Sequence, residues 1–265
     1  MSAGGAAPDW WSLPPHALAE YFGAQRWSGA RGAAIADVAV EAVVPVPLAD
    51  APPCAVLVVR GRVGDARVRW QLPLAEGMPP RDATALPAFR DAVREAVVAG
   101  RALDGTAADG SPVRWRARSV GADARLDAAL PSRVGSAEQS NTSILYGDAA
   151  ILKLFRRLEA GPQPDVEIGD ALARAGFAHV PALLGVIELQ AGDERTVLGM
   201  AQAMVPGAED AWAWLVSRAT TAVAGDARAW DASVAEAGRL GATARALRDA
   251  LAAVPDPDFA AQPAT

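Results

Sequence analysis

Lys153 is the residue whose type and setting point most directly to chemistry. The chain contains 25 lysine and arginine residues, and Lys153, in the apolar stretch "AILKLF", is the only lysine among them. A lysine ammonium is a compact charge that fits among phosphate oxygens, whereas the planar guanidinium of arginine prefers a fork geometry. We therefore interpret Lys153 as an anchor for nucleotide phosphates. The alternative interpretation is a half-buried lysine whose stem lies along a sheet while its ammonium reaches water.

The residues around Lys153 follow the order of a kinase-type phosphate site. A polar segment, "EQSNTS", precedes a short strand, and a turn at residues 146–148 leads into the strand that carries Lys153. In such sites a loop offers N–H groups and hydroxyls to phosphate, and a carboxylate from the next helix holds the lysine. We predict Glu167 as that carboxylate, with Glu159 and Asp165 as rivals. The predicted phosphate loop comprises Gln139, Ser140, Asn141, Thr142 and Ser143.

A second predicted contact with a nucleotide lies after the last strand. Backbone groups there would bind adenine, as the hinge of a kinase does. The predicted hinge comprises Gln202, Ala203, Met204 and Val205. The chain has neither a Walker A sequence nor a G-x-G-x-x-G sequence, and Gly135 is the only glycine near the predicted loop. The prediction therefore depends on the order of the elements.

Hydrophobic periodicity predicts an α+β chain with an antiparallel sheet. Alternating or continuous apolar runs predict strands at residues 36–46, 54–63, 66–74, 112–119, 180–189 and 196–205, besides the two strands around Lys153. Helical spacing predicts helices at residues 14–27, 88–100, 164–176, 209–223 and 231–254. The Gly/Asp-rich segment 104–111 is predicted as a loop, and the Pro-rich segment 76–87 as a boundary. We expect Asp165 or Pro164 to open the helix at 164–176.

Composition excludes several classes of function. A hydrophobic content of 51% with 21% charged residues is typical of a globular protein, and the net charge of −6 gives no general electrostatic case for nucleic acid or an anionic membrane. Alternating Arg114, Arg116 and Arg118 predict a solvated edge strand. The single cysteine and the two distant histidines cannot build a zinc site. We find neither a signal peptide nor an apolar run long enough to cross a bilayer, and we expect a cytoplasmic protein.

Three segments resemble the maltokinase family, which includes maltokinases fused to trehalose synthase. They are "EQSNTSILYGDAAILKLFRRLEAGPQPDVEIGDAL" with "FAHVPALLGVIE", the N-terminal "QRWSGARG", and "DAWAW". The resemblance implies a maltokinase-type N-terminal cap domain, then a eukaryotic-kinase-like N-lobe (an antiparallel sheet plus one helix) that binds the nucleotide, then the first helices of an incomplete C-lobe. The implied domains are 1–88, 89–206 and 207–265.

The same resemblance implies ATP-dependent phosphorylation of maltose to maltose 1-phosphate, in glycogen and trehalose metabolism. The family's "HGDLHLGQ"-like catalytic loop does not occur in this sequence. We therefore assign no catalytic residue and no metal ligand here, and we expect the ligands of Mg²⁺ in the remaining C-lobe. The chain by itself is not expected to be catalytically self-sufficient. The alternative is a non-catalytic homologue that binds nucleotide or docks onto trehalose synthase or a maltosyltransferase.

Overall fold

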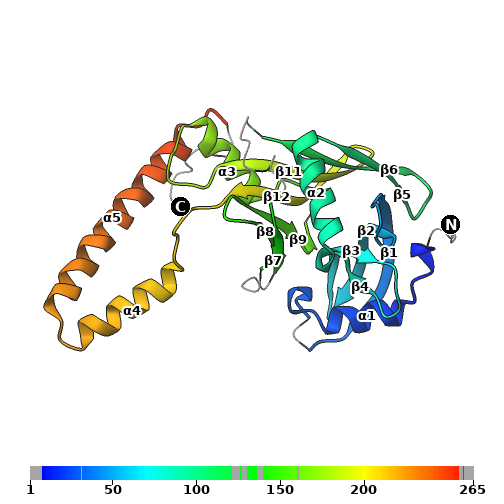
Figure 1. Cartoon of the computed structure of the whole chain (residues 1–265), viewed down its shortest axis with the longest axis horizontal. Coiled ribbons are helices and arrows are strands. Elements are labelled where there is room, and N and C mark those ends of the chain that lie inside the picture. The colour runs from blue at the N-terminus through cyan, green and yellow to red at the C-terminus, as the bar shows by residue number, and fades with distance from the viewer. Residues whose placement is uncertain are drawn as a thin grey trace. The chain divides into compact units, whose positions relative to one another are not determined.

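The computed structural model describes residues 8–30, 32–120, 126, 130–135, 140–159, 161–256 and 259 (Figure 1). The chain forms two compact units. The first comprises residues 1–166 and 183–204, and the second comprises residues 167–182 and 205–265.

Among the described residues, twelve strands of the first unit form one sheet. The strands are β1 (Ile35–Val46), β2 (Cys54–Val63), β3 (Ala66–Ala75), β4 (Arg81–Asp82), β5 (Ala102–Ala107), β6 (Pro112–Ser119), β7 (Ser132–Val134), β8 (Asn141–Tyr146), β9 (Ala150–Phe155), β10 (Arg157–Leu158), β11 (Leu183–Ala191) and β12 (Glu194–Ala203). Their order is β10-β3-β2-β1-β5-β6-β11-β12-β9-β8-β7, and β4 pairs with β3. The named strands pair antiparallel throughout, so the predicted antiparallel sheet is confirmed.

The predicted strand positions hold where the apolar pattern is strong. β2 and β3 pair in register from Cys54 and Ala75 to Val63 and Ala66, and Gly64, with φ of +59°, makes the predicted turn between them. In β6 the side chains alternate between buried and exposed, and the three arginines are exposed. β6 is nevertheless not an edge strand, because it lies between β5 and β11. The edge prediction was wrong because the strand β5 extends into the Gly/Asp-rich segment 104–111, which was predicted as a loop.

Two α-helices complete the first unit, α1 (Pro15–Gly23) and α2 (Pro87–Ala99). α2 ends at Gly100, whose φ of +62° is the left-handed conformation that glycine adopts most easily. Its buried side chains face the sheet, where α2 contacts β6, β7 and β11. A Cβ on Gly185 in β11 would collide with Val97 of α2. The missing side chain at Gly185 therefore lets the helix approach the sheet closely.

The N-terminal part of the sheet carries an aromatic cluster. Three 3₁₀-helices accompany it, η1 (Trp10–Ser12), η2 (Arg26–Ser28) and η3 (Ala83–Ala85). Phe22 of α1 packs against Trp70 of β3 with ring centroids 4.5 Å apart, and against Trp27 of η2 at 5.9 Å. All three rings are buried. Trp27 and Trp70 therefore form core, which is the commoner role of a buried indole, whereas Trp11 of η1 is exposed.

Helices α3 (Pro164–Arg174), α4 (Ala211–Val223) and α5 (Ala227–Ala252) account for the other predicted helices. The side chain of Gln163, and not that of Asp165, caps the first turn of α3, because its Oε1 accepts from the N–H of Asp165 at 2.6 Å. Asp210 caps α4 through Ala213 N–H at 2.8 Å. No residue of α4 is buried. The second unit therefore exposes large apolar side chains on both α4 and α5.

The predicted domain boundaries remain predictions. Strands from both sides of residue 88 belong to one sheet. The second unit begins with residues 167–182, and its second segment starts at Val205, close to the predicted start of the C-lobe at 207. A cap domain of the maltokinase type is not confirmed by this arrangement. Over the residues that the structure describes, no helix combines the length and the apolar character that a membrane crossing requires.

Candidate functional site

Strands β8 and β9 place Ser143 directly opposite Lys153. On the other side of β9, Met200 of β12 is the register partner of Lys153. Directly paired residues of antiparallel strands project to the same face of the sheet, so these three side chains lie side by side. Lys153 is half-buried, whereas Ser143 is 5% exposed. The sheet therefore presents a hydroxyl and an ammonium next to each other on one face.

The hydroxyl of Ser143 has no hydrogen-bond partner among the described residues, although it is shielded from solvent. A buried hydroxyl without a partner destabilises a protein, and most native structures avoid one. An unpaired hydroxyl beside a lysine ammonium suits the oxygens of a phosphate, which accept hydrogen bonds from both. The residues present therefore fit a nucleotide phosphate.

A glycine allows β12 to lie close to the strand that carries Lys153. A Cβ on Gly199 would be 2.7 Å from the carbonyl oxygen of Lys153 and 3.2 Å from Leu154 Cδ2. Both distances are shorter than side chains normally tolerate. Gly199 therefore helps to set the position of Lys153 within the sheet.

The predicted phosphate loop ends earlier than the sequence suggested. Asn141, Thr142 and Ser143 belong to β8, so the connection between β7 and β8 spans residues 135–140. Gln139 lies outside the described residues, and Ser140 is exposed. Thr142 pairs with Leu154, so its side chain is on the opposite face from Lys153, and its Oγ1 accepts from Arg156 Nε at 2.8 Å. The polar composition of "SNTS" hid the start of the strand.

Three carboxylates were predicted as partners of Lys153, and the structure tests only two of them. Lys153 makes no ion pair with any described residue of the first unit, so it pairs with neither Glu159 nor Asp165. These two carboxylates line a separate cavity of about 410 Å³, together with Asn141 at the start of β8. Glu167 belongs to the second unit. Its pairing with Lys153 stays a prediction.

The predicted hinge starts inside the sheet. Gln202 and Ala203 are the last residues of β12 and pair with Ile151 and Ala150 of β9. The N–H of Met204 donates to the carbonyl of Ala149 at 2.8 Å. Because the Met204 N–H is occupied, adenine recognition would fall to its carbonyl or to the following residues. The carbonyl of Val205 is occupied as well, because it accepts from Ala208 N–H at 3.3 Å. The Val205 N–H has no backbone partner among the described residues, so it is the donor nearest to the strand end.

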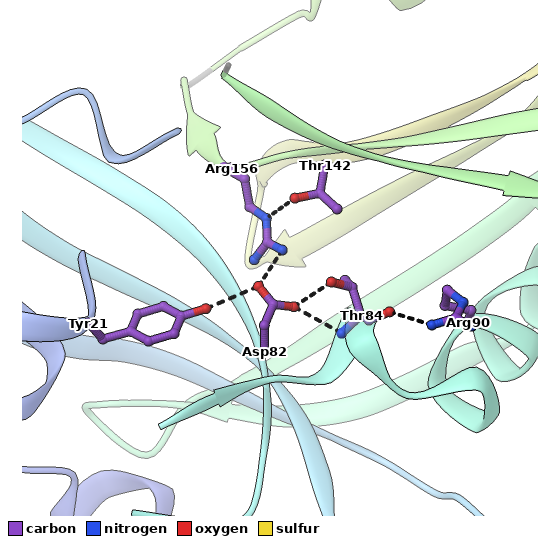
Figure 2. Close-up of polar contacts among 6 residues, drawn as sticks. All are labelled: Tyr21, Asp82, Thr84, Arg90, Thr142 and Arg156. Atoms are coloured by element: carbon purple, nitrogen blue, oxygen red, sulfur yellow. Dashed lines mark hydrogen bonds and ion pairs between the residues drawn. The ribbon is translucent and has the colours of Figure 1, made fainter. Parts of the chain in front are cut away.

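Sequence reasoning missed Arg156, which follows β9 directly. Figure 2 shows its guanidinium between Thr142 and Asp82, with Tyr21 on the other side of Asp82. Arg156 Nη2 donates to Asp82 Oδ2 at 2.6 Å, and the Tyr21 hydroxyl donates to the same oxygen at 3.0 Å. The arginine-rich composition concealed this residue, because nothing in the sequence separates a buried arginine from a solvated one. Its partners lie 74 and 14 positions away in the chain.

No metal site is evident in the described part of the chain, where no group of three or more histidine, cysteine, aspartate or glutamate residues is placed to hold an ion. The prediction that Mg²⁺ ligands lie elsewhere therefore stays a prediction.

No protein-family model matches the chain. Parts of it are similar to two curated proteins. The glucosamine kinase of Streptacidiphilus jiangxiensis is 32% identical over 119 residues, which is 44% of this chain and 27% of that protein. The glucosamine kinase of Mycolicibacterium smegmatis is 34% identical over 86 residues, 32% of this chain and 22% of that protein. The chain therefore matches well under two thirds of either relative.

Solved structures of glucosamine kinase share the fold. One in complex with glucosamine, ADP and inorganic phosphate has a TM-score of 0.58 and 22% identity, and the match covers 93% of this chain and 53% of that chain. A second, crystal form B, has a TM-score of 0.60 and 24% identity over 93% and 52% of the two chains. This chain thus spans about half the length of those kinases. The comparisons support a sugar kinase fold and do not single out maltokinases.

Proposed function

We propose that this chain is the nucleotide-binding N-terminal portion of an ATP-dependent sugar kinase. The observation that carries the proposal is the pair of Ser143 and Lys153. The buried hydroxyl of Ser143, which has no partner in the part of the chain that the structure describes, lies beside the only lysine of the sequence. The local sequence similarity to glucosamine kinases and the shared fold support it. One of those kinases was solved with ADP, which is the product expected of an ATP-dependent phosphotransferase.

Each proposed residue has a role that its position allows. The ammonium of Lys153 contacts the α- and β-phosphates, and the hydroxyl of Ser143 donates to a phosphate oxygen. Ser140, directly before β8, and Asn141, its first residue, supply further donors. Glu167 holds the Lys153 ammonium. Within the predicted hinge from Gln202 to Val205, the Met204 carbonyl and the Val205 N–H contact adenine, because the preceding residues pair with β9. Mg²⁺ would neutralise the phosphate charge, with ligands from a part of the enzyme other than the described residues.

The acceptor is the least constrained part of the proposal. The similar kinases are named for glucosamine, so we propose an amino sugar as the acceptor of the complete enzyme. Maltose, with a role in glycogen or trehalose metabolism and a trehalose synthase partner, rests only on the resemblance of three sequence segments to maltokinases. Coupled assays of ADP release with glucosamine and with maltose distinguish the two acceptors in an enzyme that contains this chain.

The proposal is tested on the chain itself by titration with MgADP in a calorimeter. We expect saturable binding of one nucleotide per chain and no transfer of phosphate from ATP to either sugar. Turnover by this chain alone would contradict the assignment of catalysis to another part of the enzyme. Absence of MgADP binding at millimolar nucleotide would contradict the assigned function.

A further inference from the structure

Arg156 occupies the single position between β9 and β10. β9 pairs with β8 and β12, whereas β10 pairs with β3, which belongs to the N-terminal part of the sheet. The carbonyl of Arg156 accepts from the backbone N–H of Gln71 in β3 at 2.9 Å. The strand that carries Lys153 is therefore attached directly to the N-terminal strands at Arg156.

The side chain of Arg156 is 1% exposed and forms a second attachment. Its Nε donates to Thr142 Oγ1 at 2.8 Å, and its Nη2 donates to Asp82 Oδ2 at 2.6 Å (Figure 2). The guanidinium carbon lies 4.8 Å from the ring centroid of Trp27. Nη1 has no hydrogen-bond partner among the described residues, and the face of an indole is a favourable neighbour for such a cation. The guanidinium is therefore enclosed by groups from three separate segments.

Asp82 is itself held in place. Its Oδ2 also accepts from the Tyr21 hydroxyl at 3.0 Å, and its Oδ1 accepts from the backbone N–H of Thr84 at 2.9 Å and from the Thr84 hydroxyl at 2.6 Å. Burial and the charge of Asp82 raise the pKa of Tyr21, so its hydroxyl remains a donor across the physiological range. A chain of contacts thus runs from α1 to the start of β8.

We propose that Arg156 is a positioning residue, through which Tyr21 and Asp82 fix the start of β8 relative to Lys153. Arg156 holds Thr142 of β8, which follows Ser140 by two positions. Arg156 itself directly follows β9, three positions after Lys153. Its side chain is enclosed, so it would act through Thr142 and Asp82 and not by direct contact with a ligand. The N-terminal region therefore acts on nucleotide affinity from a distance. This inference rests on the proposed function.

The test compares MgADP affinity in three variants of the whole chain by calorimetric titration. Tyr21→Phe removes one hydrogen bond to Asp82, and Arg156→Lys keeps the charge but loses the fork that reaches both Thr142 and Asp82. The matched control is Tyr146→Phe. Tyr146 is the only other tyrosine, and its hydroxyl donates to the Arg90 carbonyl at 2.6 Å from the end of β8 remote from the loop.

We expect Tyr21→Phe to weaken MgADP binding about fivefold, the equivalent of one hydrogen bond, and Arg156→Lys to weaken it more. Tyr146→Phe should leave the affinity unchanged. The stoichiometry separates folding from positioning, because a purely structural defect lowers the fraction of binding-competent chains and leaves their affinity intact. Wild-type affinity in Tyr21→Phe would overturn the positioning role alone. A wild-type chain that does not bind MgADP would overturn the proposed function, and this inference with it.

Discussion

Ser143 and Lys153 are register partners on β8 and β9, and the Ser143 hydroxyl beside the lysine is buried without a hydrogen-bond partner among the described residues. A phosphate oxygen would accept from both groups at once. Under the proposed function, this pairing accounts for a lysine in an apolar strand of a chain that otherwise uses arginine. It also separates two roles within the polar segment before β9, because Ser143 faces the lysine and Thr142 faces Arg156.

Replacing Ser143 with alanine should weaken nucleotide binding without weakening the fold. The change removes a buried hydroxyl that has no partner, so the free energy of unfolding should stay unchanged or rise by about 1 kcal/mol. MgADP affinity should fall several-fold in a calorimetric titration. Ser132→Ala is the control, because Ser132 Oγ accepts from Arg90 Nε at 2.9 Å. Ser132→Ala should lose stability and keep the wild-type affinity for MgADP. If Ser143→Ala loses stability and keeps its affinity for MgADP, Ser143 is not part of the site.

Gly199→Ala should destabilise the first unit. The new Cβ would lie 2.7 Å from the Lys153 carbonyl oxygen, and β12 or β9 would have to move. Overpacking of this kind costs about 1–3 kcal/mol, measured by urea denaturation. Gly238→Ala in α5 is the matched control, since nothing lies within 4 Å of a Cβ there. Helix propensity predicts that the control is about 1 kcal/mol more stable than the wild-type chain. Equal stabilities for the two variants would contradict the close approach at Gly199.

Glu194 should contribute to stability only above acidic pH. The hydrogen bond from Arg69 to Glu194, 2.7 Å long, lowers the pKa of this carboxyl. A depressed pKa in the folded state stabilises the protein above the unfolded pKa of about 4.3, and this contribution is lost as pH falls through the folded value. Glu194→Gln should therefore lose stability at pH 7 and show a flatter decline between about pH 5 and 3. Glu209→Gln, at an exposed position, is the control and should follow the wild-type curve.

The apolar surface of α4 and α5 should make the isolated chain self-associate. Trp212 is 76% exposed and Trp230 is 60% exposed, and patches of this kind promote association. Changing both to glutamine should lower the sedimentation coefficient at high protein concentration and reduce binding of a hydrophobic dye. Trp11→Gln, at an exposed position of η1 in the first unit, should change neither measurement. If the wild-type chain, the double variant and Trp11→Gln sediment identically, α4 and α5 do not carry an associating surface.

The sequence predicted elements well where apolar residues recur with a clear period. β1, β2, β3 and α2 lie within one or two residues of their predicted bounds, because each combines a strong pattern with a terminating Gly or Pro. β5 was missed because its segment contains Asp104 and Gly105, which are typical of loops. β10 was missed because two residues carry no period.

The candidate site was predicted only in part, for a different reason. Local order singled out both Ser143 and Lys153, but it assigned Ser143 to the phosphate loop and did not predict that Ser143 pairs with Lys153. Arg156 could not be predicted, because its role depends on Asp82 and Tyr21, which reach it only after the sheet has formed. The strand register, which places Thr142 and Ser143 on opposite faces, is likewise a property of the sheet and not of the segment.

The proposed role of Lys153 is to hold the phosphates of a nucleotide, and titration of the chain with MgADP is the decisive measurement of that role. The wild-type chain should bind, and both Lys153→Ala and Lys153→Arg should bind at least about tenfold more weakly, because neither places a compact charge among the phosphates. The pair of variants separates the need for an ammonium from the need for any cation. Wild-type affinity in both variants would contradict the claim.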